Sequence, residues 1–196
     1  MWLMILLVAT VPGQLWQQRD PRLWARLPAS VAGQIQLLAD SAARVRLPAE
    51  PLIQKALEGH SKGAPGDRIV TAVAALLRAL ESARSALGPS AVESEIMAGA
   101  EWLRAGGTAP HLTGLRRTAP TRQLAAAIAM GTDLMTRGWT ENDAAAATDR
   151  FLTAKATDRD FLLLRDRIEQ AVRAGSSPKA AVLSEVRRLE SGDRRP

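Results

Sequence analysis

Apolar side chains recur every three to four residues along most of this chain, and this spacing constrains the fold more than any other feature. Between Pro65 and Leu87 they form one stripe, while charged and hydroxyl residues occupy the opposite side. A period of about 3.6 residues is typical of a helix with one buried face. Leu77 is therefore expected in the core and Arg78 in solvent. The stripe consists of Ile69, Val73, Leu76, Leu77, Leu80 and Leu87.

The composition extends this expectation to the whole chain. Leu and Ala dominate the apolar residues, aromatic residues make up only 4%, and runs of β-branched residues are scarce. Helix propensity therefore exceeds strand propensity almost everywhere. The sequence predicts an all-α fold.

Four turns share one form, in which a helix ends at a basic residue and a glycine and another helix begins soon afterwards. Their glycines are Gly63, Gly106, Gly138 and Gly175, separated by 43, 32 and 37 residues. These intervals fall in the range of helical-hairpin repeats, but any helical bundle also turns through glycine caps. Two architectures of about eight or nine helices stay open on this pattern, an irregular helical bundle and a degenerate helical-hairpin array.

Hydroxyl and carboxyl side chains predict several helix starts. Ser90 with Glu93 has the spacing of a capping box, in which each side chain binds the backbone amide of the other residue. Thr140, Thr157 and Ser177 also stand where an N-cap side chain would accept a bond from a free amide of the next helix.

The chain is long enough for one domain with a hydrophobic core. Residues 1–13 contain a short uncharged apolar run that is typical of a signal peptide and too short to span a bilayer. We therefore expect cleavage after Gly13 and a periplasmic or secreted protein with no transmembrane span in the mature chain. Residues 14–27 are expected to form a linker or irregular lead-in, residues 28–190 a single helical domain, and residues 191–196 a frayed tail.

The net charge of +6 would suit nucleic acid or another acidic partner. Arg and acidic residues alternate along the expected helices, however, which is the pattern of solvated helix faces. An intracellular basic protein that binds nucleic acid therefore remains the alternative, with the apolar N-terminal run as a buried helix. The chain contains no Cys, so no disulfide or thiolate metal site is possible.

The sequence shows no pattern of catalytic or metal-binding residues. His60 and His111 are far apart, and neither has another ligand at metal-binding spacing. No nucleophile elbow, phosphate-binding loop or zinc-protease motif is present. We expect no enzyme activity, no catalytic residue, no metal and no cofactor.

Two polar corners are candidate binding sites. In the first, Glu58, His60 and Lys62 lie among glycines and a proline before a helix start whose free amides could take an anion. In the second, three arginines surround another helix start and could grip a phosphate or carboxylate. Both corners can also be explained as helix ends with solvated side chains. The arginines are Arg116, Arg117 and Arg122.

Two tryptophans near helix ends, Trp102 and Trp139, either cover the core or mark a partner surface. The segment Pro51–Pro65, with Arg68-Ile69-Val70 after it, resembles a segment of uncharacterised helical proteins of bacteria that are predicted to be exported. This resemblance implies export and helices, and it implies no activity. We therefore expect a non-catalytic binding or scaffold protein whose partner is a protein or an anionic component of the cell envelope.

Overall fold

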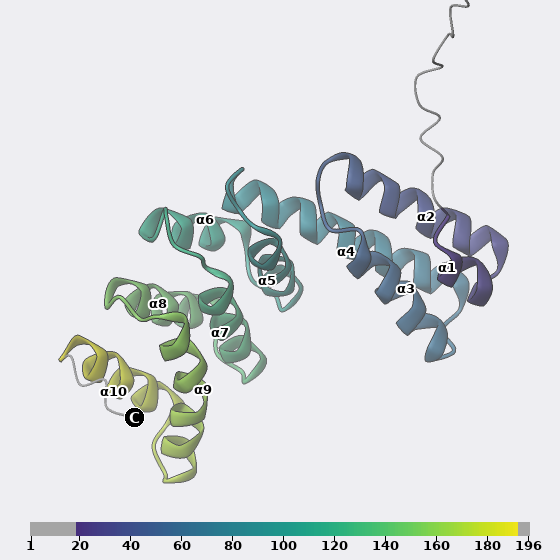
Figure 1. The fold of residues 1–196 in the computed structure, drawn as a ribbon. Coiled ribbons are helices and arrows are strands. Elements are labelled where there is room, and N and C mark those ends of the chain that lie inside the picture. The colour runs from purple at the N-terminus through teal and green to yellow at the C-terminus, as the bar shows by residue number, and fades with distance from the viewer. Residues whose placement is uncertain (1–18, 192–196) are drawn as a thin grey trace, which may run out of the picture.

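The computed structural model describes residues 19–191, which form ten α-helices and no strand (Figure 1). The predicted all-α fold is confirmed. The expected signal segment and most of the expected tail lie outside the described residues. The helices are α1 (Pro21–Arg26), α2 (Ala29–Arg44), α3 (Glu50–Ser61), α4 (Gly66–Leu87), α5 (Glu93–Arg104), α6 (Ala109–Thr118), α7 (Ala125–Thr136), α8 (Glu141–Thr153), α9 (Asp158–Arg173) and α10 (Pro178–Glu190).

The irregular lead-in expected over residues 14–27 is wrong where the structure describes it, because α1 forms there. The side chain of Asp20 accepts a bond from the amide of Arg22, and a proline occupies the first helical position. Leu23 is fully buried, and Arg22 makes an ion pair of 2.7 Å with Glu50 of α3. Such a short helix has no clear period of its own, so its burial against the rest of the fold stabilises it.

The helix starts follow the predicted caps with one exception. The capping box at Ser90 and Glu93 is wrong, because α5 begins later, with Val92 as its N-cap and the Glu95 carboxylate accepting from the Val92 amide at 2.9 Å. Glu95 is buried and binds other helix ends as well, so tertiary contacts select the later start. The side chains of Thr140, Thr157 and Ser177 accept amide bonds from Asp143, Asp160 and Ala180, as predicted.

The long helix α4 joins two parts of the fold. Its predicted stripe is buried throughout, Leu77 is 7% exposed, and Arg78 lies on the exposed side. The helix packs on α2 and α3 and also on α5 and α6. Helices α1 to α4 therefore form a small bundle, from which the rest of the chain continues (Figure 1).

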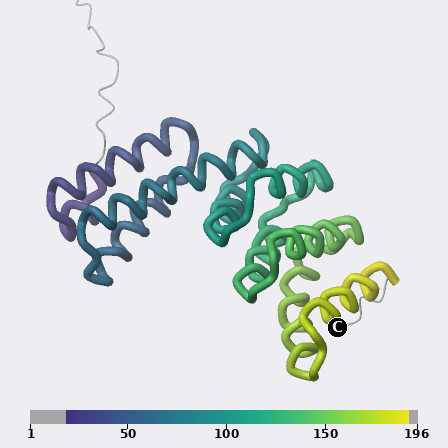
Figure 2. Tube along the Cα trace, turned by 180° about the vertical axis from the view of Figure 1, so that it is seen from behind, coloured from purple at the N-terminus to yellow at the C-terminus, as the bar shows by residue number. Residues whose placement is uncertain are grey.

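From α4 onward the helices form a two-layer array of hairpins. Helices α5, α7 and α9 contact one another in order and make one layer, while α4, α6, α8 and α10 make the other. Each helix thus packs on the helix two positions further along the chain, as in stacked hairpins (Figure 2). Both expected architectures are therefore present in one molecule, a bundle at the N-terminal end and an array beyond it.

The four glycine turns of the sequence pattern lie along one edge of the molecule (Figure 2). In stacked hairpins alternate turns fall on the same side, so the α3–α4, α5–α6, α7–α8 and α9–α10 turns share this edge. Gly63, Gly106, Gly138 and Gly175 have φ angles of 70°, 98°, 88° and 97°. This left-handed conformation strains other residues, which explains the recurrence of glycine.

Trp102 is the largest fully buried side chain of the array. Its indole nitrogen donates to the carbonyl oxygen of Thr108 at 3.3 Å. Its ring lies against Gly131 of α7, where a side chain would not fit: a Cβ atom there would be 2.6 Å from the indole. Trp102 therefore belongs to the core that joins α5 to α7.

Candidate functional site

The first predicted corner is held together by its own charges. The Glu58 carboxylate accepts bonds from Lys62 and, at 2.9 Å, from Lys55, all within the last turns of α3 and its C-cap. Bonds from Lys62 and Lys55 lower the pKa of Glu58 to about 2. His60 is exposed in the last turn. Glu58 and Lys62 are therefore paired with each other, and local pairing accounts for both charges without a ligand.

In the second predicted corner, Arg116 joins four helices. Its guanidinium binds the Glu95 carboxylate at 2.6 Å, the carbonyl oxygen of Leu87 at 3.2 Å and that of Arg122 at 2.9 Å. Glu95 is only 2% exposed and also accepts from the amide of Leu124 at 2.8 Å. This network ties together the C-terminal ends of α4 and α6 and the N-terminal ends of α5 and α7.

The other two arginines of that corner point to different places. Arg122 donates to the carbonyl oxygen of Ala156 and so fastens the α8–α9 turn. Arg117 is exposed on α6, at the border of hollows between α4 and α6 and between α6 and α8. The side chains of the three arginines therefore do not converge on one site: two of them hold helices together, and one faces solvent.

A groove between α7 and α9 is bordered by two exposed large apolar side chains of the array. It runs over about three turns of each helix, and we call it the α7–α9 groove. The side chain of Leu162 is 73% exposed and that of Val172 is 37% exposed, and both border it. Exposed apolar side chains gathered in one hollow surface are typical of an interaction site.

The groove contains two hollows. The first, of about 160 Å³, lies over Met130 and Phe161, with Leu162 at its rim. The second, of about 450 Å³, lies over Leu134 and Ile168. Its wall includes Val172, Trp139 from the turn before α8, and Pro178, the first residue of α10.

An ionic cluster separates the two hollows. Arg137 binds Asp133 at 2.8 Å and Glu169 at 2.6 Å. Arg173 lies 3.4 Å from Glu169, and Arg165 lies 3.7 Å from Glu169 and 3.9 Å from Asp133. The hydrogen bond from Arg137 lowers the pKa of Glu169. Three guanidinium groups thus share two carboxylates, and the cluster carries a surplus of positive charge.

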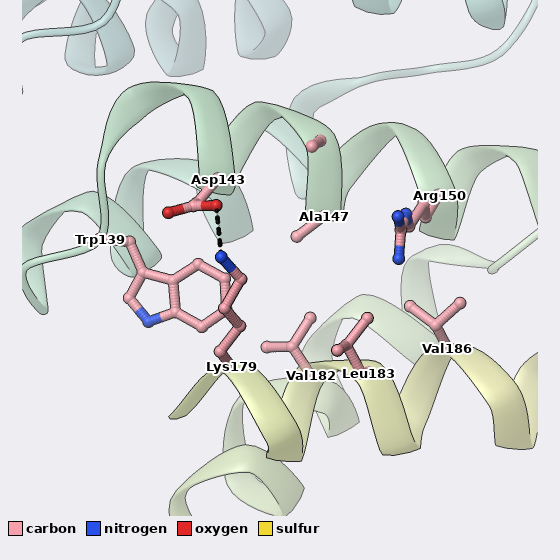
Figure 3. Close-up of a pocket in the computed structure, with 9 residues that line it drawn as sticks. Trp139, Asp143, Ala147, Arg150, Lys179, Val182, Leu183 and Val186 are labelled. Atoms are coloured by element: carbon pink, nitrogen blue, oxygen red, sulfur yellow. Dashed lines mark hydrogen bonds and ion pairs between the residues drawn. The ribbon is translucent and has the colours of Figure 1, made fainter. Parts of the chain in front are cut away.

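Trp139 also borders a smaller hollow on its other side, between α8 and α10. Figure 3 shows its indole beside the side chain of Lys179, which makes an ion pair of 3.0 Å with Asp143. Hydrogen bonds from Lys179 and then Thr140 lower the pKa of Asp143. The apolar floor of this hollow includes Ala147 and Val182 (Figure 3). Trp139 thus lies near a helix end, as expected, and its side chain borders two hollows.

Sequence reasoning missed a contact between His111 and Glu141. The imidazole Nδ1 lies 2.6 Å from the Glu141 carboxylate, and the ring packs edge-on against Trp102. Burial by itself raises the pKa of Glu141, but bonds with His111 and Thr108 more than offset it and lower the pKa. The partners are 30 residues apart, so no local motif signals this pair.

The α7–α9 groove was also missed, although one signal was present. The alternation from Arg165 to Glu169 predicts a solvated helix face, and in the structure its charged residues Arg165 and Glu169 also line the groove. Within residues 19–191 no three His, Asp or Glu side chains are placed to hold a metal ion. Among the same residues, no helix has the length and apolarity needed to cross a membrane.

The fold and the groove define a helical-hairpin array with an open, partly apolar groove between two helices of one layer. No protein-family model, curated protein or solved structure matches the chain significantly.

Proposed function

We propose that the chain is an exported, non-catalytic protein-binding module that holds a segment of its partner in the α7–α9 groove. The observation that carries this proposal is the pair of apolar hollows with an ionic cluster between them. A protein interface typically combines buried apolar anchors with a polar surround that fixes the register. The export part of the proposal rests on the apolar run of residues 1–13 and on the resemblance of the Pro51–Pro65 segment.

The charge distribution favours a protein partner over nucleic acid. Many basic side chains are paired with carboxylates, including Lys62, Arg104, Arg116 and Arg137. Non-specific nucleic-acid binding needs many unpaired cations that follow a phosphate backbone. The remaining surplus of charge in the groove is small and lies beside apolar hollows, which suits a segment with both apolar and acidic side chains.

Site-specific photo-crosslinking in the cells of origin tests the proposal. A photoreactive amino acid at Val172 is expected to give a distinct protein adduct, because this side chain borders the larger hollow. Leu37 of α2 is the matched control, since its side chain is 62% exposed and lies outside the array. A photoreactive residue at position 37 is expected to give no such adduct.

The adduct is then identified by mass spectrometry, and the purified partner is titrated with the wild-type chain and with Val172→Asp. The proposal expects the substitution to weaken binding at least about tenfold, since it places a charge in an apolar contact. Equal adducts at positions 172 and 37, or equal affinity of wild type and variant for the identified partner, would refute it.

A further inference from the structure

We infer that the occupant of the α7–α9 groove is an amphipathic α-helix of a partner protein, with two apolar anchors about two turns apart and carboxylates between them. This inference rests on the proposed function and specifies the partner segment. A helix laid in a groove is a recurring mode of peptide recognition, and it is recognised by the spacing of its apolar anchors.

The length of the groove fits a helical segment. Its lining on α7 extends from Ala126 to Arg137 and on α9 from Phe161 to Arg173. At about 1.5 Å per residue each wall is about 16–18 Å long, which is three turns of helix. The N-terminal halves of both helices border the first hollow and their C-terminal halves border the second. The two walls therefore run in the same direction.

The spacing of the hollows fixes the spacing of the anchors. On α9 the first hollow is bordered by Phe161, Leu162 and Arg165, and the second by residues from Ile168 to Arg173. The two centres are seven to eight residues apart, or about 11 Å along the helix axis. On a bound helix, residues i and i+7 lie on one face at this separation. Large apolar side chains at these positions would enter both hollows together.

The charge between the hollows fixes the middle of the segment. Three guanidinium groups share the carboxylates of Asp133 and Glu169, and Arg137 takes the short contacts with both. Arg165 and Arg173 make only contacts of 3.4–3.9 Å, and their side chains are 61% and 80% exposed. An incoming carboxylate could therefore bind either of them without breaking a short ion pair. Acidic residues at i+3 and i+4 would lie over this cluster.

The test uses designed peptides of 14 residues and the full chain, with binding measured by fluorescence anisotropy. The acidic peptide carries Leu at i and i+7 and Glu at i+3 and i+4. A basic peptide has Lys in place of both Glu residues, and an anchorless peptide has Ser in place of both Leu residues. The acidic peptide is expected to bind at least about tenfold more tightly than either control. The lysines of the basic peptide would be repelled by the arginines of the groove, which attract the carboxylates of the acidic peptide. The anchorless peptide lacks the apolar burial that supplies most of the affinity.

Variants of the chain locate the binding and the charge preference. The double change Leu162→Asp and Val172→Asp is expected to abolish binding, whereas Leu37→Asp leaves it unchanged. The double change Arg165→Glu and Arg173→Glu is expected to reverse the preference, so that the basic peptide binds more tightly. All these positions are exposed, so circular dichroism melts are expected to show the folded state in each variant.

Equal affinity for the acidic and basic peptides would overturn the inference, and so would binding that survives the change at Leu162 and Val172. A groove-dependent dimer of the chain in sedimentation, lost in Leu162→Asp, would overturn it by showing a second copy as the occupant. The two proposals can fail separately. A specific adduct at Val172 together with failure of the acidic peptide keeps the binding function and rejects the acidic helix.

Discussion

The close approach of α7 to Trp102 makes Gly131 a position where one added methyl group should destabilise the fold. A Cβ atom on Gly131 would lie 2.6 Å from Cζ3 of Trp102 and 2.8 Å from Oγ1 of Thr148. Both neighbours are fully buried, and Thr148 donates to the carbonyl oxygen of Ala144 at 2.9 Å. Neither side chain can move aside into solvent, so Gly131→Ala must displace α7 itself.

The size of the effect follows from two opposing contributions. Overpacking a core by one methyl group costs about 1–3 kcal/mol, and the upper end applies here because both contacts are far below van der Waals distance. Replacing a glycine with alanine inside a helix contributes about 1 kcal/mol in the opposite direction. The free energy of unfolding should therefore fall by about 2 kcal/mol, which corresponds to a melting temperature about 4–8 °C lower.

Gly114 of α6 is the matched control. A Cβ atom there would have as its nearest neighbour the guanidinium of Arg117, at 4.0 Å, so nothing has to move. Gly114→Ala should therefore show only the stabilising effect of alanine over glycine inside a helix, and should raise the free energy of unfolding by about 0.5–1 kcal/mol. Urea denaturation followed by circular dichroism measures both changes. Effects of the same sign in the two variants would refute the packing of α7 on Trp102 described above.

Three further predictions concern the core, the buried ion pair and the N-terminus. Leu77→Ala should cost about 2–5 kcal/mol and Arg78→Ala less than about 0.5 kcal/mol in urea denaturation, and equal losses would contradict the assigned faces of α4. Burial by itself raises the pKa of Glu95, but amide bonds and Arg116 more than offset it and lower the pKa. This carboxylate therefore stabilises the fold at neutral pH and loses its contribution as the pH falls below about 4.5. A Glu95→Gln variant should be less stable than wild type at pH 7 and should lose less stability on acidification. Parallel profiles of stability against pH for wild type and variant would exclude this role. Mass spectrometry of the secreted chain should show an N-terminus near Gln14, and full-length chain in the cytoplasm would contradict export.

The features that could be predicted from the sequence depend on residues close together in the chain. The stripe of α4 and the caps at Thr140, Thr157 and Ser177 are local, since each needs only neighbours within a few turns. The glycine turns are local too, because the left-handed conformation that follows a helix favours glycine, which has no side chain, at that one position. The cap expected at Ser90 failed because the buried Glu95 accepts from the amides of Val92 and Leu124, and its contact with Val92 sets the start of α5.

The spatial relations of the candidate site depend on tertiary structure. Arg137 meets Glu169 across 32 residues, and His111 meets Glu141 across 30. Neither pair has a local signal, because the partners lie on helices whose relative placement is set by packing. The same packing took Arg116 out of the expected anion site and placed it against Glu95, and it buried Leu23 so that α1 could form. Periodicity along one helix determines which face is apolar, and only the stacking of the hairpins decides which apolar residues are covered and which, like Leu162 and Val172, remain open along a groove.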